Sequence, residues 1–181
     1  MYTHNLLREM LALNNPHEFV LLSQEAGSLS SYSNGRQGQV RERALGKAPS
    51  FMWDQWLVPQ AEREEKLDLI FNPKYSLPLS ARCQTMFVCH GLDWYVMPWG
   101  PKLMDRLSHR YLIPRYAKKA DAIIAVSETV KEQVINYLGI AEERVHTVYL
   151  GVDEAFRRPV PSEKLEQVRC EYRLPERFFP Y

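Results

Sequence analysis

The chain alternates short apolar runs with longer amphipathic segments. In the opening segment, apolar residues recur at helical spacing up to residue 13, and Asn14-Asn15-Pro16 then ends the predicted helix. The same spacing returns four times further along the chain. The predicted helices span residues 2–13, 51–66, 101–119, 127–138 and 162–172.

Runs of strand length, apolar on both faces, lie between these helices. The predicted strands span residues 18–23, 68–71, 84–89, 121–126 and 145–150. Such strands, alternating with helices, are typical of a parallel sheet that is covered on both sides. The expected fold is therefore α/β: a Rossmann-like, doubly wound, mainly parallel sheet with helices on both faces.

Two segments need separate interpretation. Residues 27–50 are rich in Ser, Gly and Arg, and they predict a long surface loop. Residues 51–66 predict a helix with Trp53 and Trp56 on one face, in which Pro59 causes a kink or starts a new helix.

Composition narrows the class of protein. The 181 residues carry a net charge of +1, which gives no indication of a nucleic-acid partner, and no apolar run approaches the ~20 residues that span a bilayer. Cys83, Cys89 and Cys170 show no C-x-x-C spacing, so we expect reduced structural thiols in a cytoplasmic protein. The sequence shows no metal-ligand spacing, dinucleotide fingerprint, P-loop or nucleophile elbow.

Ligands of doubly wound sheets bind at the carboxyl ends of the strands, which directs attention to the loops there. The loop after Cys89 reads "HGLDWYVMPWGPK". His90 can donate a hydrogen bond or act as a base near neutral pH, and Asp93 can accept bonds from sugar hydroxyls. Trp94 or Trp99 can stack on a sugar face. The alternative is a structural histidine beside a packed turn.

Two further loops hold weaker candidates. The predicted helix after residue 126 begins at Ser127, and its free amides, with Lys131 nearby, suit an anion such as phosphate. The alternative is that Ser127 only caps the helix, which Gly139 ends, and that Lys131 is solvated. After the last strand, Gly151 turns the chain ahead of Asp153, which has no assigned meaning by itself.

Several stretches, taken in order, resemble the amino-terminal half of a family 4 (group 1) glycosyltransferase of the GT-B fold. They include "WDQWLVPQA", "LDLIFNPKYSLPL" and "VCHGLDW". The most specific one is "ADAIIAVSETVKEQVINYLGIAEERVHTVYLGVDEAF", which is similar to the family's A-D-x-I-I-x-V-S … G-V-D-x-x-F run.

This resemblance implies retaining transfer of a sugar from a nucleotide-diphosphate-sugar donor, with no required metal or other cofactor. The acceptor would be a sugar, a lipid-linked molecule or another small molecule. His90 would contact the donor sugar or the acceptor near the reacting centre. Gly91, Ser127, Gly151 and Asp153 would shape the wall of the cleft.

The resemblance also implies an organisation. Residues 1–174 correspond to the acceptor-side domain without its first strand and Gly-rich turn, and residues 175–181 begin a linker to a second domain. Two strands would then lack a neighbour or would have to re-pair. We expect little transfer by such a fragment. The alternative is a non-catalytic interaction module, or a split subunit that needs a separate donor-binding chain.

Basic residues of the predicted helix 101–119 allow contact with the inner face of a membrane, as in relatives with lipid acceptors. An ordinary solvated face is the alternative. The residues concerned are Arg106, Arg110, Arg115, Lys118 and Lys119.

Overall fold

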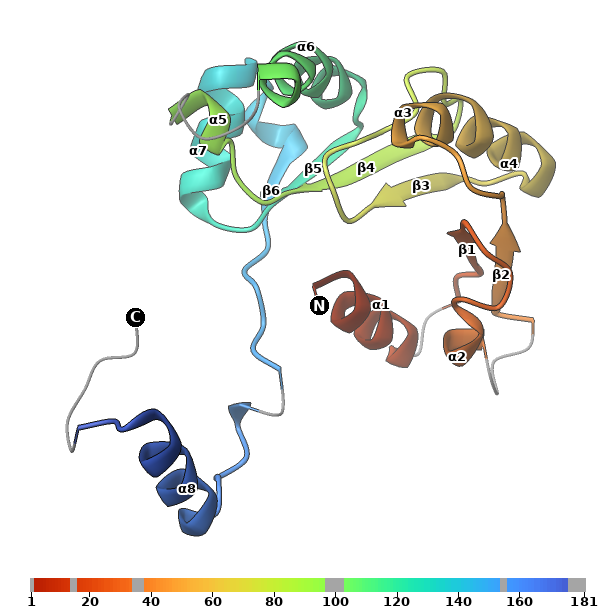
Figure 1. Cartoon of the computed structure of the whole chain (residues 1–181). Helices are drawn as coiled ribbons and strands as arrows, with labels where there is room; N and C mark the ends of the chain where they lie inside the picture. The colour runs from red at the N-terminus through yellow and green to blue at the C-terminus, as the bar shows by residue number, and fades with distance from the viewer. Residues whose placement is uncertain (1, 14–15, 34–37, 97–102, 154–155, 176–181) are drawn as a thin grey trace. The chain divides into compact units, whose positions relative to one another are not determined.

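The structure is a computed structural model. It describes residues 2–13, 16–33, 38–96, 103–153 and 156–175. Two compact units, Met1–Tyr149 and Leu150–Tyr181, make up the chain, and each is described by itself (Figure 1). That residues 1–174 form one domain stays a prediction.

The first unit is built on a parallel sheet of four strands in the order β3-β4-β5-β6. Its strands are β3 (Leu69–Asn72), β4 (Gln84–Cys89), β5 (Ala122–Ala125) and β6 (Val145–Thr147). Consecutive residues of β4, Phe87 and Val88, are both fully buried. Because neighbouring side chains of a strand point to opposite faces, both faces of the sheet are covered. The predicted parallel α/β sheet is confirmed.

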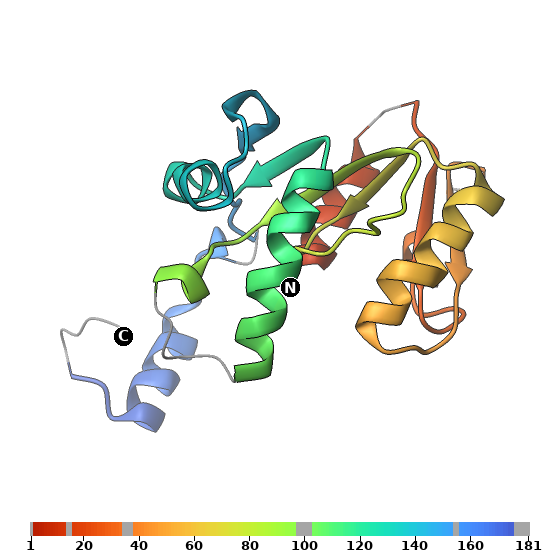
Figure 2. The ribbon, with the colours of Figure 1, turned by 90° about the horizontal axis from the view of Figure 1, so that it is seen from above.

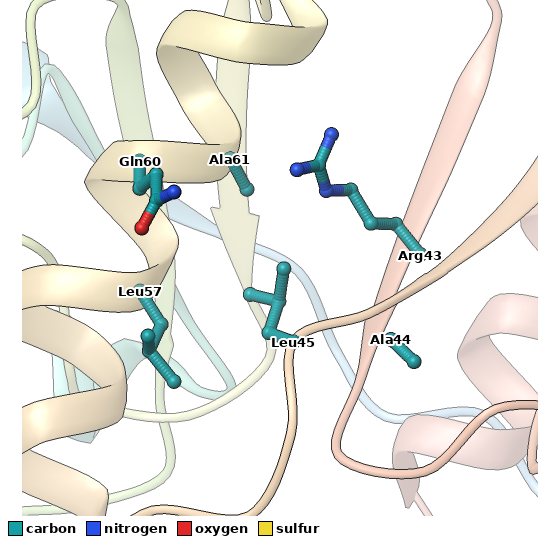
Figure 3. A pocket seen from close by; sticks show the side chains of 6 residues that line it. All are labelled: Arg43, Ala44, Leu45, Leu57, Gln60 and Ala61. Atoms are coloured by element: carbon teal, nitrogen blue, oxygen red, sulfur yellow. The ribbon is translucent and has the colours of Figure 1, made fainter.

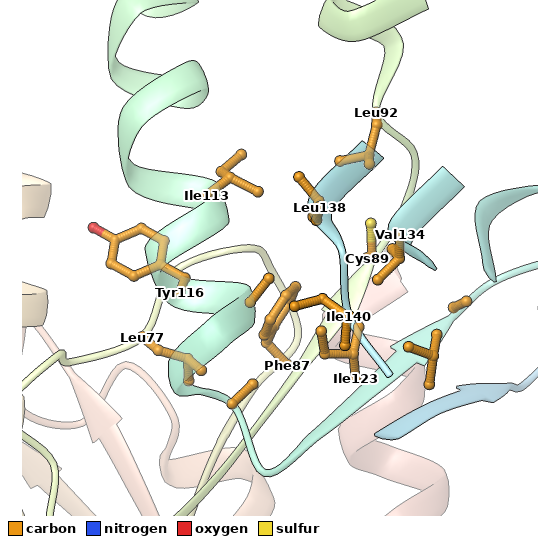
Figure 4. Close-up of a cluster of buried hydrophobic side chains, with 14 of the residues drawn as sticks. Leu77, Phe87, Cys89, Leu92, Ile113, Tyr116, Ile123, Val134, Leu138 and Ile140 are labelled. Atoms are coloured by element: carbon orange, nitrogen blue, oxygen red, sulfur yellow. The ribbon is translucent and has the colours of Figure 1, made fainter. Parts of the chain in front are cut away.

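Helices lie on both sides of this sheet, as Figure 2 shows for the red α1 and the green α6. The longer helices are α1 (Tyr2–Ala12), α6 (Leu103–Lys119) and α7 (Glu128–Leu138). The shorter ones are α5 (Asp93–Val96) and the 3₁₀ turn η2 (Glu142–Arg144), neither of which the sequence predicts. Between α6, α7 and the sheet lies the main hydrophobic core, in which Phe87, Ile123 and Val134 are fully buried (Figure 4).

A second, two-stranded parallel sheet pairs β1 (Phe19–Ser23) with β2 (Val40–Ala44). The prediction of a loop over residues 27–50 is therefore wrong, since β2 and the short helix α2 (Ser30–Ser33) lie within it. The apolar pattern does not predict β2, "VRERA", because only Val40 is buried. Its charged side chains bind partners on neighbouring elements.

The helix predicted at residues 51–66 consists of α3 (Ser50–Met52), the π-helical turn η1 (Trp53–Leu57) and α4 (Val58–Glu65). Pro59 sits in the first turn of α4, which confirms the predicted new start. The prediction that both tryptophans share a face is wrong. Trp53 packs against the core, whereas Trp56 is 58% exposed, because the wider π turn interrupts the α-helical spacing.

The last strand is shorter than predicted. β6 ends at Thr147, whereas the sequence predicts a strand to residue 150. The Val148 amide still donates to the Ala125 carbonyl oxygen at 2.9 Å, but β5 ends there and offers no further partners. In the second unit, α8 (Ser162–Tyr172) ends at Arg173, which takes the left-handed conformation with φ 50°.

Candidate functional site

The strand ends of β4 and β5 bring two predicted site residues to the same edge of the sheet. His90 follows the end of β4 directly, and Ser127 lies two residues beyond the end of β5. The strands are neighbours, with Cys89 opposite Ala125. This is the carboxyl edge of the sheet, where α/β folds bind their ligands.

The imidazole of His90 is held by the loop that follows β3. Its Nε2 lies 3.0 Å from the carbonyl oxygen of Pro73. Because a carbonyl oxygen only accepts, this bond assigns a proton to Nε2. In the neutral ring, Nδ1 is then the acceptor, suited to a hydroxyl of a bound molecule.

Two tyrosines flank the same ring. Tyr2, from the start of α1, lies edge-on with ring centroids 4.6 Å apart, and Tyr75 lies edge-on at 6.2 Å. Burial raises the pKa of both phenols, and nearby Cys89 and Asp93 raise the pKa of Tyr75 further. Both hydroxyls therefore keep their protons at neutral pH and can donate hydrogen bonds.

The turn after His90 requires glycine. Gly91 has φ 149°, and a Cβ there would lie 3.2 Å from Oδ1 of Asp93. The Leu92 amide donates to Oε1 of Gln133 on α7 at 3.2 Å, which ties the turn to the neighbouring helix. Asp93 is exposed and begins α5, so the structure places Gly91 and Asp93 together beside His90.

The tryptophans of this loop lie beyond what can be described. Trp99 is outside the described residues, and of Trp94 only the backbone, in α5, is described.

Ser127 and Lys131 both have structural partners. Ser127 Oγ accepts from the Val130 amide at 3.2 Å and caps α7, as predicted, and Gly139 ends the helix in the left-handed conformation. Nζ of Lys131 lies 3.0 Å from Oε1 of Glu142, forming an ion pair with η2. Whether either side chain also binds an anion stays a prediction.

Gly151 and Asp153 belong to the second unit, which is described by itself. Gly151 is exposed, and the Asp153 carbonyl oxygen accepts from the Phe156 amide at 2.9 Å. Their predicted place in a cleft wall stays untested.

Sequence patterns missed Tyr2, Tyr75 and Gln133. Tyr2, at the start of α1, meets His90 only through tertiary packing. Tyr75 and Gln133 reach the site only through tertiary packing.

The neighbouring thiol of Cys89 is buried. Burial raises the pKa of Cys89 to about 11, so this thiol stays protonated at neutral pH. Among the residues that the structure describes, no group of three His, Cys, Asp or Glu side chains is arranged to hold a metal ion.

A small pocket lies elsewhere, between the end of β2 and the η1–α4 helix (Figure 3). It is lined by Arg43, Ala44, Leu45, Leu57, Gln60 and Ala61. None of the predicted site residues lines it, so it offers no alternative place for their chemistry.

Comparison with known proteins identifies the family of this chain. The model of the family described as Glycosyltransferase Family 4 matches residues 1–156, and the chain belongs to this family. The chain is also similar to the serotype-specific mannosyltransferase WbdA of Escherichia coli, with 31% identity over 101 residues. This match covers 52% of the chain and 12% of that protein, so the chain spans a small part of its curated relative.

One solved structure is also similar to this chain. The crystal structure of a glycosyltransferase from Rickettsia africae ESF-5 matches with a TM-score of 0.49 and 16% identity. The match covers 93% of this chain and 43% of that chain.

Contact with a membrane surface stays a prediction. None of the helices in the described part of the chain is both long and apolar enough to cross a bilayer. Of the basic residues on α6, Arg115 donates from Nη1 to the Tyr111 carbonyl oxygen at 2.6 Å.

Proposed function

We propose that the His90 edge of the sheet is the acceptor-side wall of a sugar-transfer site. The transfer would use a nucleotide-diphosphate-sugar donor and retain the anomeric configuration, as the family resemblance implies. The observation that carries the proposal is the bond from Nε2 of His90 to Pro73, because it leaves Nδ1 as the acceptor for a sugar hydroxyl.

The surroundings of His90 suit a carbohydrate. Tyr2 and Tyr75 each combine an apolar ring with a hydroxyl donor. Asp93 is exposed and, when ionised, accepts hydrogen bonds from hydroxyl pairs. Gly91 has no side chain, so a bound sugar can approach the backbone closely at this position. Within this proposal Ser127 and Lys131 lie toward the donor phosphates, and Gly151 and Asp153 keep the role in a cleft wall that the family resemblance implies.

The donor would bind mostly to a second domain, so the 181 residues alone would transfer little sugar. Because WbdA is named a mannosyltransferase, mannosyl transfer is the first activity to assay. A radiolabelled nucleotide-diphosphate-mannose would be incubated with methyl glycosides and the 181-residue chain, in wild-type form and as His90→Ala. Little or no transfer by either form is expected. Clear transfer by the wild-type chain, lost in His90→Ala, would show that the chain holds a complete site.

The second candidate is an interaction module without sugar affinity, which could pair with a separate donor-binding chain. Saccharide binding separates the two. The acceptor-side wall must bind a sugar near His90, whereas an interaction module need not.

A further inference from the structure

The π-helical turn η1 lies against the loop that holds His90. Gln55, the middle residue of η1, makes two hydrogen bonds to that loop. Its Nε2 donates to the Leu77 carbonyl oxygen at 2.9 Å, and its Oε1 accepts from the Leu79 amide at 3.0 Å. One side chain thus bridges the residues on either side of Pro78, which has no amide hydrogen of its own.

The anchored end of the loop is firmly placed. Leu77 is fully buried in the main core. At the other end, Asn72 at the end of β3 accepts from the Lys74 amide at 2.9 Å and donates to Ser76 Oγ at 3.0 Å. The four residues 73–76 are therefore fixed at both ends, by Asn72 and by the Gln55-bound Leu77.

This short segment supplies the partners of His90. The Pro73 carbonyl oxygen accepts from Nε2, and the Tyr75 ring lies edge-on to the imidazole. A second contact from the π turn reaches the same segment, because Asp54 is hydrogen-bonded to Ser76. The π turn therefore contacts the segment that carries the Pro73 carbonyl, although Gln55 does not touch His90 itself.

We propose that Gln55 is a positioning residue: by clamping the loop around Pro78, it aims the Pro73 carbonyl at Nε2 and so fixes the tautomer of His90. A π turn at this place offsets the α-helical spacing, which is consistent with the frequent use of such turns at functional sites. The relevance of this tautomer to sugar binding rests on the proposed function, but the tautomer itself is measured without any sugar.

The experiment uses the 181-residue chain labelled with ¹⁵N in its histidines, at a pH above about 8, where imidazoles are neutral. The ¹⁵N chemical shifts of the ring give the ratio of the two tautomers, and a His90→Gln variant assigns the signals. The wild-type chain is expected to hold His90 predominantly with the proton on Nε2. Gln55→Leu removes both bonds to the loop. The ratio is then expected to fall about fivefold, which is the effect of losing the single hydrogen bond from Nε2 of His90 to the Pro73 carbonyl oxygen.

Two further variants sharpen the test. Gln55→Glu is nearly isosteric and keeps the acceptor for the Leu79 amide, but its second carboxylate oxygen would face the Leu77 carbonyl oxygen, acceptor against acceptor. A fall at least as large as in Gln55→Leu is therefore expected. Gln60→Leu is the matched control, because Gln60 lies on the same helical segment but donates only to the exposed Glu64, and its ratio should equal that of the wild type. An unchanged ratio in the Gln55 variants that keep the wild-type melting transition would overturn the proposal, as would a wild-type His90 without a preference for Nε2.

Failure of the two proposals can be told apart. If the tautomer changes as expected but no saccharide binds near His90, the positioning role stands and the proposed function falls. If saccharides bind near His90 but the tautomer ratio is unchanged in the Gln55 variants, the proposed function stands and the positioning role falls.

Discussion

Single residues at the edge of the sheet are fixed by local geometry rather than by the general fold. Gly91 combines a left-handed φ of 149° with the close approach of Asp93, and Ser127 supplies the first acceptor for the free amides of α7. Each of these features predicts how a substitution changes the free energy of unfolding.

At Gly91, a Cβ adds conformational strain and a contact of 3.2 Å with Oδ1 of Asp93. Gly91→Ala is therefore expected to lower the free energy of unfolding by about 2 kcal/mol, measured by urea denaturation. Gly46→Ala is the control. Gly46 also has a positive φ, 84°, but a Cβ there would meet open space, so a loss of about 1 kcal/mol is expected. Equal losses at both positions would show that the Asp93 contact is irrelevant.

At Ser127, removal of the hydroxyl leaves the Val130 amide without its cap. Ser127→Ala should cost about 1 kcal/mol of stability in the same denaturation assay, whereas Ser127→Asp should retain nearly all of it, because aspartate is an equally good cap. An aspartate variant as unstable as the alanine variant would contradict the capping role.

Elements of the first unit are joined by polar contacts that the apolar pattern does not reveal. Arg43 of β2 forms ion pairs with Glu64 and Glu65 of α4, and Asp121 connects the starts of β4 and β5. These contacts decide how firmly the strands with few buried residues are held.

The ion pairs of Arg43 link the two-stranded sheet to α4. Arg43→Gln is expected to speed amide hydrogen exchange in β1 and β2 severalfold at low salt, and the difference should shrink in about 1 M salt because the charges are screened. Arg41→Gln is the control, since Arg41 is more exposed and has one partner, Glu65, at 3.3 Å. An effect of Arg43→Gln that is confined to α4 would contradict the proposed link.

The Asp121 carboxylate accepts from the Thr85 amide at 2.7 Å and from its hydroxyl at 3.0 Å, and these bonds hold its pKa below the ordinary value of 3.8. Because the pKa is lower in the folded state, the stabilisation by these bonds is complete above the ordinary value of 3.8. It is lost as the pH falls from there through the lower pKa of the folded state. The melting temperature of the wild type should therefore fall more between about pH 6 and about pH 3 than that of Asp121→Asn. Glu132→Gln, at an exposed acid on α7, should follow the wild type, and an identical acid response of Asp121→Asn would refute the role of these bonds.

The elements that the sequence predicts are those whose pattern is set by burial. β4 and β5 are apolar on both faces, so their runs indicate buried parallel strands whatever surrounds them. β2 is different, because its charged residues are satisfied by Glu64, Glu65 and the backbone of a neighbouring turn, and no local pattern shows this. For the same reason His90 was predictable from its place after a strand, whereas Tyr75 and Gln55 were not.

The whole molecule consists of two units of unequal size, and among the described residues only those of the larger unit form an extensive core. The second unit holds α8, none of whose residues is buried. Family membership is established for residues 1–156, which extend from the first unit into the second.

This division predicts where proteases act. Leu150, Val152 and Phe156 are between 52% and 75% exposed, and they lie outside the α-helices and strands. Brief chymotrypsin treatment should cleave first near these residues, and the product that contains residues 1–149 should keep the melting transition of the intact chain. Mass spectrometry identifies the cut. First cleavage within β3–β6 would contradict the division into two units.

Saccharide binding at His90 is the most direct test of the proposed acceptor-side wall. A panel of methyl hexosides would be titrated into the ¹⁵N-histidine-labelled chain up to about 50 mM, a range that detects millimolar dissociation constants. We expect at least one hexoside to shift the ring signals of His90 and to leave those of His146, on β6, unchanged. No shift at His90 with any hexoside, from a chain with its native melting transition, would contradict a sugar site at this edge of the sheet.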